Sequence, residues 1–220
     1  MIVAMSVLFV LIAAAGAGEG QHAEGGANHR FDDVDAWVKR FEDPSRDAWQ
    51  RPDVVLSFLE VVDGSRVADI GAGTGYFAVR AARLVGARGH VWAIDVEPGM
   101  VEHLGKRAQD LALPQLEPVL TAPDDPGIPA GAADVVLIVN TWHHIEDRAV
   151  YLGKLRGRLR PAGRVAIVDY REGELPVGPP ADHKLSRSQV LGEFVDAGWA
   201  LAAESTDLPY QYVLVFRPKP

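Results

Sequence analysis

The chain has 220 residues, 48% hydrophobic and 24% charged, which suits one globular domain and is too apolar for an intrinsically disordered chain. Asp and Glu outnumber Lys and Arg by 30 to 22, and the net charge of −8 disfavours binding to nucleic-acid phosphates, which needs clustered cations. The absence of cysteine excludes disulfides, thiolate metal sites and a cysteine nucleophile.

The N-terminal segment differs from the rest of the chain because its first 18 residues contain no charged side chain. The apolar run over residues 2–15 fits the hydrophobic region of a secretory signal and is short for a bilayer-spanning helix. Ala15-Gly16-Ala17 matches a cleavage pattern, but no Lys or Arg precedes the apolar run. Three interpretations stay open: an export signal, an uncleaved anchor attaching residues 2–17 to a membrane, or a misassigned start or plain N-terminal helix.

The composition predicts four parts along the chain: a signal-like or anchor segment (1–18), a Gly-, Ala- and Glu-rich linker (19–28), N-terminal lid helices (29–63) and a core (64–220). Helices are predicted at residues 35–41 and 51–62, with a break around Pro44. Aromatic side chains in this region either pack on the core or close over a ligand, and we assign Trp49 to the lid.

Strands and helices alternate after this region. Apolar runs predict strands at residues 66–70, 90–96, 117–120, 134–139 and 163–170. Helices are predicted at residues 77–85, from Pro98, from Asp147 through Leu159, and from a capping box at Ser186 through Ala197. The last strands, 201–205 and 212–216, lie too close together for a crossover helix and should form a hairpin. This order predicts an α/β, Rossmann-like, seven-stranded sheet, mostly parallel with a terminal antiparallel hairpin and helices on both faces.

A glycine-rich turn follows the first of these strands and reads Asp69-Ile70-Gly71-Ala72-Gly73-Thr74-Gly75. Glycines at such a turn allow a ligand to approach the backbone, and the following helix start offers free N–H groups. The third glycine comes one residue earlier than in the dinucleotide pattern G-x-G-x-x-G, which also lacks the preceding acid. A second acid, Asp95, ends the next strand, and this pair of carboxylates suits a ribose diol and an amine.

This turn, Asp95, residues 134–138 and the run Leu159-Arg160-Pro161-Ala162-Gly163-Arg164-Val165 closely resemble the class I S-adenosylmethionine-dependent methyltransferases. The resemblance extends over residues 67–216 and implies S-adenosylmethionine as the cofactor. It implies that Asp69 holds the amino end of the cofactor and that Asp95 accepts both ribose hydroxyls. The cofactor-binding residues that we expect are Asp69, Gly71, Ala72, Gly73, Thr74, Gly75, Asp95, Val96, Asp124 and Asn140. For Asp124, an adenine contact and an ordinary turn are equally open readings.

A polar segment, Asn140-Thr141-Trp142-His143-His144, follows the fourth predicted strand, at the edge where open α/β sheets bind ligands. Small-molecule members of the resembled family often carry a similar His-His pair. Asn140 is expected beside the transferable methyl group, and Trp142 to present its π face to the sulfonium. His143 and His144 are the candidate catalytic bases, with His143 preferred; the alternative is that they only shape the pocket.

The predicted substrate-binding set extends to the end of the fifth strand and comprises Trp49, Trp142, His143, Asp169 and Tyr170. A structural reading of Asp169 and Tyr170 is equally open. His143, His144, Asp169, Asp182 and His183 include metal-ligand types. We expect no metal, because Tyr170 stands where the resembled catechol-type enzymes have Asn after the acid. Residues 171–185 form a stiff, Pro-rich second candidate lid.

The predicted function is therefore methyl transfer to a small molecule by direct displacement, without nucleic acid as a partner. Asn140-Thr141-Trp142-His143 lacks the N-P-P-Y-type motif of DNA amino-methyltransferases. The alternatives are a protein or lipid acceptor, a non-catalytic cofactor-binding protein and, less favoured, a nicotinamide-dependent oxidoreductase; the oligomeric state is undetermined. An exported location conflicts with the cytosolic supply of S-adenosylmethionine, and the protein is cytoplasmic if the N-terminal segment is not used.

Overall fold

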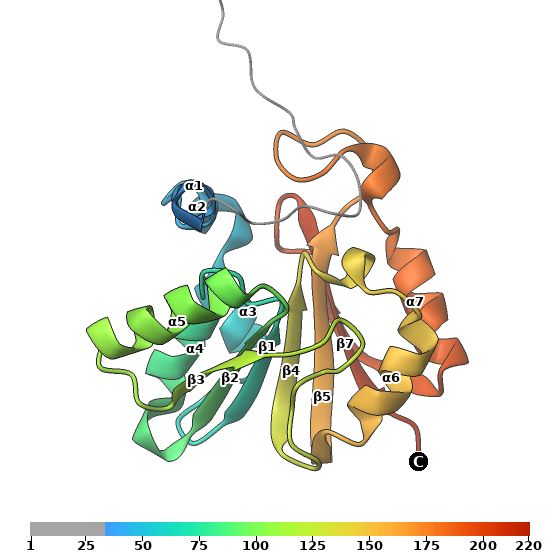
Figure 1. The fold of residues 1–220 in the computed structure, drawn as a ribbon. Helices are drawn as coiled ribbons and strands as arrows, with labels where there is room; N and C mark the ends of the chain where they lie inside the picture. Colours follow the sequence, from blue (N-terminus) through green and yellow to red (C-terminus); the bar gives the residue numbers. More distant parts are fainter. Residues whose placement is uncertain (1–33) are drawn as a thin grey trace, which may run out of the picture.

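The computed structural model describes residues 34–220, so the predicted signal-like segment (1–18), the linker (19–28) and the expected domain start at residue 29 lie outside the described residues. The strands form one sheet in the order β3-β2-β1-β4-β5-β7-β6 (Figure 1). They are β1 (Arg66–Ile70), β2 (His90–Asp95), β3 (Leu116–Leu120), β4 (Ala133–Val139), β5 (Leu159–Tyr170), β6 (Trp199–Ser205) and β7 (Gln211–Pro218).

The strand pairing confirms the predicted topology. The first five strands pair in parallel around the central β1, which lies between β2 and β4. β7 inserts antiparallel between β5 and β6, so the last two strands form the expected hairpin. Because the first five strands run in parallel, their carboxyl ends meet at one edge of the sheet, where open α/β sheets bind ligands.

Helices cover both faces of the sheet. Among the described residues they are α1 (Val34–Phe41), α2 (Arg46–Gln50), α3 (Pro52–Phe58), α4 (Ala78–Val85), α5 (Pro98–Asp110), α6 (Arg148–Arg156) and α7 (Arg187–Asp196), with 3-10 turns η1 (Gly86–Arg88), η2 (Trp142–His144) and η3 (Ala181–His183). Successive strand residues point to opposite faces: Val67 packs with α3, α4 and α5, whereas Ala68 packs with α6 and α7. Continuous apolar strands suit such a two-sided core.

Two predicted helix ends are confirmed. The Ser186 hydroxyl accepts a hydrogen bond from the Gln189 backbone N–H (3.0 Å), and the Gln189 side chain accepts one from the Ser186 N–H (2.9 Å), which completes the capping box. Pro98 is the first residue of α5, where its missing N–H costs nothing.

The predicted helix over residues 51–62 is too long. It ends at Phe58, because the Glu60 N–H donates to the Ser57 carbonyl and the Val61 N–H to the Leu56 carbonyl. These bonds form a Schellman motif in which Glu60 takes the left-handed conformation, with φ +50°. Glycine usually marks this position, so the sequence pattern did not show the stop.

Two further boundaries differ from prediction. The short helix α2 occupies a segment that was predicted as a break between helices. Leu159, assigned to a helical stripe with Tyr151 and Leu155, instead begins β5 and pairs with Ala133. Four-residue spacing alone did not distinguish the last turn of α6 from the residues that follow it.

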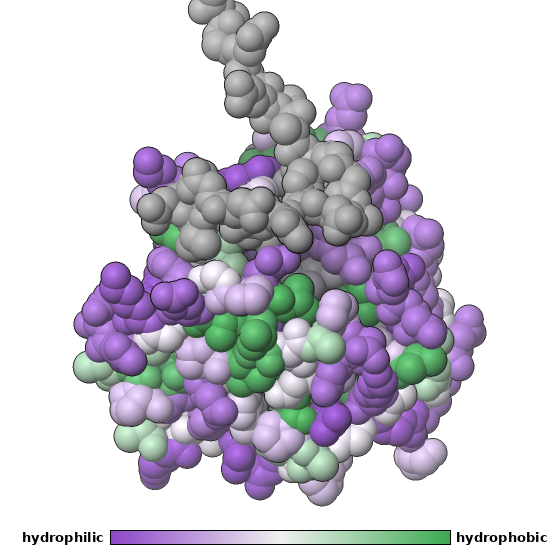
Figure 2. Space-filling view, viewed as in Figure 1, coloured by the Kyte–Doolittle hydropathy of each residue, from purple (hydrophilic) through white to green (hydrophobic). Residues whose placement is uncertain are grey.

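Both candidate lid segments lie near the carboxyl ends of the parallel strands. In Figure 1, α1 and α2 and the loop after β5 lie at the end of the sheet toward which β4 and β5 point. On the face shown in Figure 2, hydrophobic residues gather near the centre, and hydrophilic residues predominate over the helices at both sides. Within residues 34–220, no helix has both the length and the apolar composition needed to cross a membrane.

Candidate functional site

The glycine-rich turn requires its glycines. Gly71, Gly73 and Gly75 have φ angles of +72°, +54° and +89°, a region that L side chains avoid. A Cβ added to Gly71 would lie 2.2 Å from the Thr141 hydroxyl, and one on Gly75 would lie 2.6 Å from Leu104 Cδ2. The turn is therefore pressed between the segment after β4 and helix α5.

Two acids border this turn, as predicted from their positions at adjacent strand ends. Asp95 accepts hydrogen bonds from the N–H groups of Gly73 (2.8 Å) and Glu97 (3.0 Å) and is 8% exposed. Asp69 is 3% exposed; its burial, together with the nearby charge of Asp95, raises its pKa to about 7. Burial also raises the pKa of Asp95. A buried pair of carboxylates favours a ligand that brings a cation and hydrogen-bond donors.

The raised pKa of Asp69 predicts a pH-dependent stability. Its pKa is higher in the folded protein than the ordinary value of 3.8, so its stabilising contribution is present below that value and is lost as pH rises through about 7. The full effect corresponds to about 4 kcal/mol of unfolding free energy. We expect thermal unfolding at about pH 5 and about pH 8 to show a smaller drop in stability for Asp69→Asn than for the wild type. An identical drop in both proteins would contradict this assignment.

Asn140 connects the end of β4 to two other strands. Its Oδ1 accepts from Gln211 Nε2 (2.6 Å), and its Nδ2 lies 3.4 Å from the Tyr170 hydroxyl. Asn140 has a φ of +53°, a conformation that asparagine tolerates better than most residues and that often marks functional sites. The next residue, Thr141, contacts Gly71, so the expected methyl-transfer position lies next to the glycine-rich turn.

His143 is paired with a buried acid. Its Nδ1 lies 3.1 Å from Asp169 Oδ2, and the Asp169 side chain is 1% exposed. The other Asp169 oxygen accepts the Tyr170 N–H (2.8 Å), which fixes the carboxylate. This arrangement assigns the Nδ1 proton to the bond with Asp169 and leaves the Nε2 lone pair available. Asp169, predicted to touch the acceptor, is buried behind His143. His144 is exposed, with its ring 4.1 Å from that of His143.

The prediction for Trp142 is wrong. Its side chain is fully buried, its ring packs 5.2 Å from that of Phe194, and its Nε1–H donates to Glu193 Oε2 (2.8 Å). Successive residues of a 3-10 turn point about 120° apart, so η2 directs Trp142 into the core under α7 and His143 toward β5. A cavity of about 610 Å³ lies between α6 and α7, beside Glu193. None of the predicted site residues lines it.

Trp142 is a buried core residue, so replacing it should lower the stability of the folded protein. We expect Trp142→Ala to lower the unfolding free energy by about 3–5 kcal/mol, because it leaves a large cavity and removes one hydrogen-bond donor from Glu193, which keeps its ion pair with Arg148. Urea unfolding measures this change, with the half-buried Trp49→Ala as the control that should lose less. Normal stability with impaired turnover would restore the ligand-binding reading.

Trp49 of α2 packs against Tyr170, whose hydroxyl lies beside Asn140. Its ring lies 6.0 Å from that of Tyr170 and 6.1 Å from that of Tyr210. A Cβ on Gly178 would lie 2.6 Å from the Tyr170 ring, so the loop after β5 packs on the same aromatic group. Trp49 and Tyr170, both predicted to bind the acceptor, therefore lie in contact with each other. Their contacts with an acceptor stay predictions.

Asp124 lies apart from the paired acids. Its side chain is 79% exposed, and its carboxylate binds Lys154 of α6 (2.7 Å), which lowers its pKa. These contacts favour the turn reading. Beside Asp95 the surface is apolar instead: Val96 is 43% exposed, and Leu120, the β3 residue in register with Asp95, is 54% exposed.

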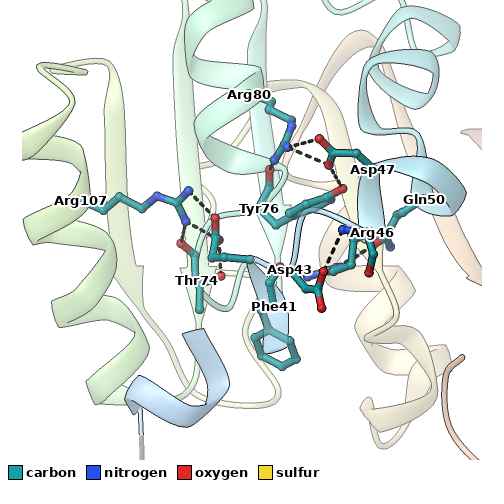
Figure 3. Close-up of polar contacts among 11 residues, drawn as sticks. Phe41, Asp43, Arg46, Asp47, Gln50, Thr74, Tyr76, Arg80 and Arg107 are labelled. Atoms are coloured by element: carbon teal, nitrogen blue, oxygen red, sulfur yellow. Dashed lines mark hydrogen bonds and ion pairs between the residues drawn. The ribbon is translucent and has the colours of Figure 1, made fainter. Parts of the chain in front are cut away.

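Sequence reasoning missed the polar contacts that hold the N-terminal helices to the turn (Figure 3). Glu42 accepts hydrogen bonds from the Thr74 hydroxyl (2.6 Å) and from Arg107 Nη2 (2.6 Å). Asp47 accepts from the Tyr76 hydroxyl and from Arg80 (2.9 Å). Apart from Thr74, which lies in the glycine-rich turn, these residues belong to no recognisable motif, and only the fold brings α1 and α2 to the turn.

Comparisons with known proteins identify relatives of the core. Residues 67–163 match the family model described as "Methyltransferase domain". The chain is 34% identical over 128 residues to aklanonic acid methyltransferase DauC of Streptomyces sp. (strain C5), covering 57% of this chain and 58% of that relative. The chain thus spans little more than half the length of this curated relative.

Solved structures show the same fold. A SAM-dependent methyltransferase from Aquifex aeolicus superimposes with a TM-score of 0.78 and 26% identity, over 82% of this chain and 96% of that one. The cyclase SpnF superimposes with a TM-score of 0.66 and 15% identity, over 77% of this chain and 80% of that one. SpnF is similar in fold alone, and it is a [4+2]-cyclase.

Proposed function

Because this chain belongs to the class I S-adenosylmethionine-dependent methyltransferases, we propose that it transfers a methyl group from S-adenosylmethionine to a small-molecule acceptor. The observation that carries the proposal is the glycine-rich turn with its two buried acids, Asp69 and Asp95. The glycines add no side chains that would shield the backbone N–H groups of the turn, and the acids suit an ammonium group and a diol. When bound, the cofactor supplies a methyl group activated by a sulfonium.

Asp95 is proposed to bind the ribose. A carboxylate offers about four lone-pair sites, and backbone N–H groups occupy two of those of Asp95. Two sites remain for two hydroxyls. Asp69 is proposed to face the amino group, and the exposed apolar surface of Val96 and Leu120 lies where an adenine ring would be shielded from water. Asp124 has less support as an adenine contact because Lys154 already binds it.

On the acceptor side, His143 is proposed as the general base. Asp169 holds its Nδ1, and its Nε2 accepts the proton of the acceptor hydroxyl or amine as the new bond to carbon forms. Direct displacement mainly requires alignment, for which Asn140 and Tyr170 are the proposed positioning groups. The half-buried Trp49 and the loop after β5 are proposed as the walls that close over the acceptor.

A titration with three ligands tests this function. We expect the purified protein to bind S-adenosylmethionine and S-adenosylhomocysteine and to show no response to NADH. Tight NADH binding without a response to S-adenosylmethionine would favour the oxidoreductase alternative. Screening acceptors for S-adenosylhomocysteine formation then separates methyl transfer from a non-catalytic protein of the same fold; a bound cofactor that no acceptor consumes would favour the second.

The location of the protein is proposed from residues 1–18, which lie outside the described residues. Their apolar composition supports targeting to a membrane, either as a cleaved export signal or as an anchor, with residues 19–28 as the linker to the domain. Fractionation of the full-length protein, with mass determination of its N-terminus, tests this. An uncut protein in the cytosolic fraction would show that the segment is not used.

A further inference from the structure

Arg46 lies at the start of α2, between the glycine-rich turn and the aromatic group around Tyr170. Its guanidinium carbon is 4.0 Å from the centre of the Tyr76 ring, and Tyr76 directly follows the turn. It donates to Gln50 Oε1 from Nε (3.0 Å) and Nη2 (2.6 Å), and to the Phe41 carbonyl from Nη1 (Figure 3). Arg46 is therefore held in place by neutral acceptors.

Among residues 37–220, whose side chains the structure describes, the charge of Arg46 has no ion-pair partner, whereas neighbouring arginines are paired. Arg80 binds Asp47, and Arg107 binds Glu42. Glu42 lies close enough to influence Arg46, but Arg107 and Thr74 occupy its oxygens. The charge of Arg46 also helps to lower the pKa of Asp43, but that carboxylate is exposed and accepts the Ser45 N–H. A partly buried, unpaired cation is costly unless an anion completes it.

Gln50 adds a hydrogen-bond donor without a partner. Its side chain is fully buried, and its Nε2 has no hydrogen-bond acceptor. The amide orientation is set by Arg46, because the opposite flip would place Nε2 against the guanidinium. Three of the five guanidinium N–H groups are used, so the pair offers surplus donors and a surplus positive charge. A carboxylate has the geometry and charge that match a guanidinium.

The surroundings place this donor pair where the two reactants would meet. Arg46 lies within electrostatic range of Tyr170, whose hydroxyl is bonded to Asn140. Trp49, adjacent to Gln50, packs on the Tyr170 ring. On the other side lies Tyr76, at the end of the turn proposed to bind the methionine half of the cofactor.

We propose that Arg46 and Gln50 form a subsite for a carboxylate group of a bound reactant. The inference rests on the proposed function and deepens it. A carboxylate reaches this place from one of two sources: the methionine end of S-adenosylmethionine, or an acidic acceptor lying against Trp49 and Tyr170. The chemistry of recognition is the same for both sources, and two binding experiments distinguish them.

The first experiment measures the affinity of the wild type, Arg46→Gln and Arg46→Lys for S-adenosylmethionine and for its decarboxylated analogue, by calorimetry. If the cofactor supplies the carboxylate, Arg46→Gln should weaken S-adenosylmethionine binding by about 10- to 100-fold and leave the analogue unchanged. Arg46→Lys keeps the charge without the planar fork and should lose less. Arg88→Gln, which removes an exposed ion pair with Asp63, is the control and should bind like the wild type.

The second experiment adds naphthoate or naphthamide to the protein saturated with S-adenosylhomocysteine. If the acceptor supplies the carboxylate, the wild type should prefer naphthoate over naphthamide by about tenfold, and Arg46→Gln should lose this preference. Folded Arg46→Gln that binds all these probes as the wild type does would overturn the subsite. A wild type that binds no adenosyl ligand would instead refute the proposed function, so the two failures are distinguishable.

Discussion

Replacing Asp95 by alanine should lower the affinity for S-adenosylhomocysteine by about 100-fold. The reason is that two charge-assisted hydrogen bonds to the ribose, at about 1.5 kcal/mol each, correspond to about two orders of magnitude in the dissociation constant. Asp95 has two oxygens, and the N–H groups of Gly73 and Glu97 leave part of their accepting capacity for the diol. Calorimetric titration of both proteins with S-adenosylhomocysteine measures the change.

Two controls sharpen this prediction. Asp95→Asn keeps one accepting oxygen without the charge, so its loss should lie between wild type and alanine. Methylthioadenosine has the ribose but no amino acid, and its affinity should fall by the same factor as that of S-adenosylhomocysteine. An Asp95→Ala protein that is folded and binds both ligands normally would remove Asp95 from the ribose site.

Replacing His143 by alanine should reduce kcat by about 100- to 1,000-fold and change the cofactor affinity by less than about twofold. The proposed base acts on the acceptor proton, whereas the proposed ribose and amino contacts, Asp95 and Asp69, lie on β2 and β1. Asp169→Asn should lower kcat by a smaller factor, because the histidine remains but loses the carboxylate that orients it. Steady-state kinetics with an acceptor found by screening, together with calorimetry, gives both quantities.

The neighbouring histidine is the matched control. His144 is exposed, so His144→Ala should keep most of the activity if His143 is the base. Equal losses of turnover and cofactor affinity in His143→Ala would mean that the histidine is structural. An acceptor whose nucleophile carries no proton should show little dependence on His143, which is a second independent check.

Local sequence signals predicted the frame of the site well. Asp69 and the three glycines lie in one strand and the turn that follows it, so their relative positions follow from local backbone geometry. Asp95 ends the parallel strand that pairs with β1 after a single crossover helix, which is a predictable arrangement. Gly71 and Gly75 were expected to allow a ligand to approach the backbone. In the structure Thr141 and Leu104 lie against them, and the approach of a ligand stays a prediction. The capping box at Ser186 was predictable for the same reason, since both partners lie within one helical turn.

Side-chain direction in irregular segments was not predictable. Trp142 and His143 are adjacent in the sequence, and a 3-10 turn sends the first into the core and the second to Asp169. The end of α3 at Phe58 also escaped prediction, because the left-handed residue after the helix is Glu60 and not the glycine that usually marks such a stop. Such outcomes depend on a few dihedral angles rather than on residue type.

The sequence by itself determined the fold class, the glycine-rich turn, its two acids and the position of the His-His segment at the carboxyl edge. Local periodicity and strand-end position contain this information. Only the tertiary structure decided which side chains meet: Asp169 with His143, Glu42 with Thr74, and Arg46 with the Tyr76 ring. These contacts join residues from separate elements. Pairing of β4 with β5 brings the first pair together, and packing of α1 and α2 over the turn brings the other two, so no spacing along the chain encodes them.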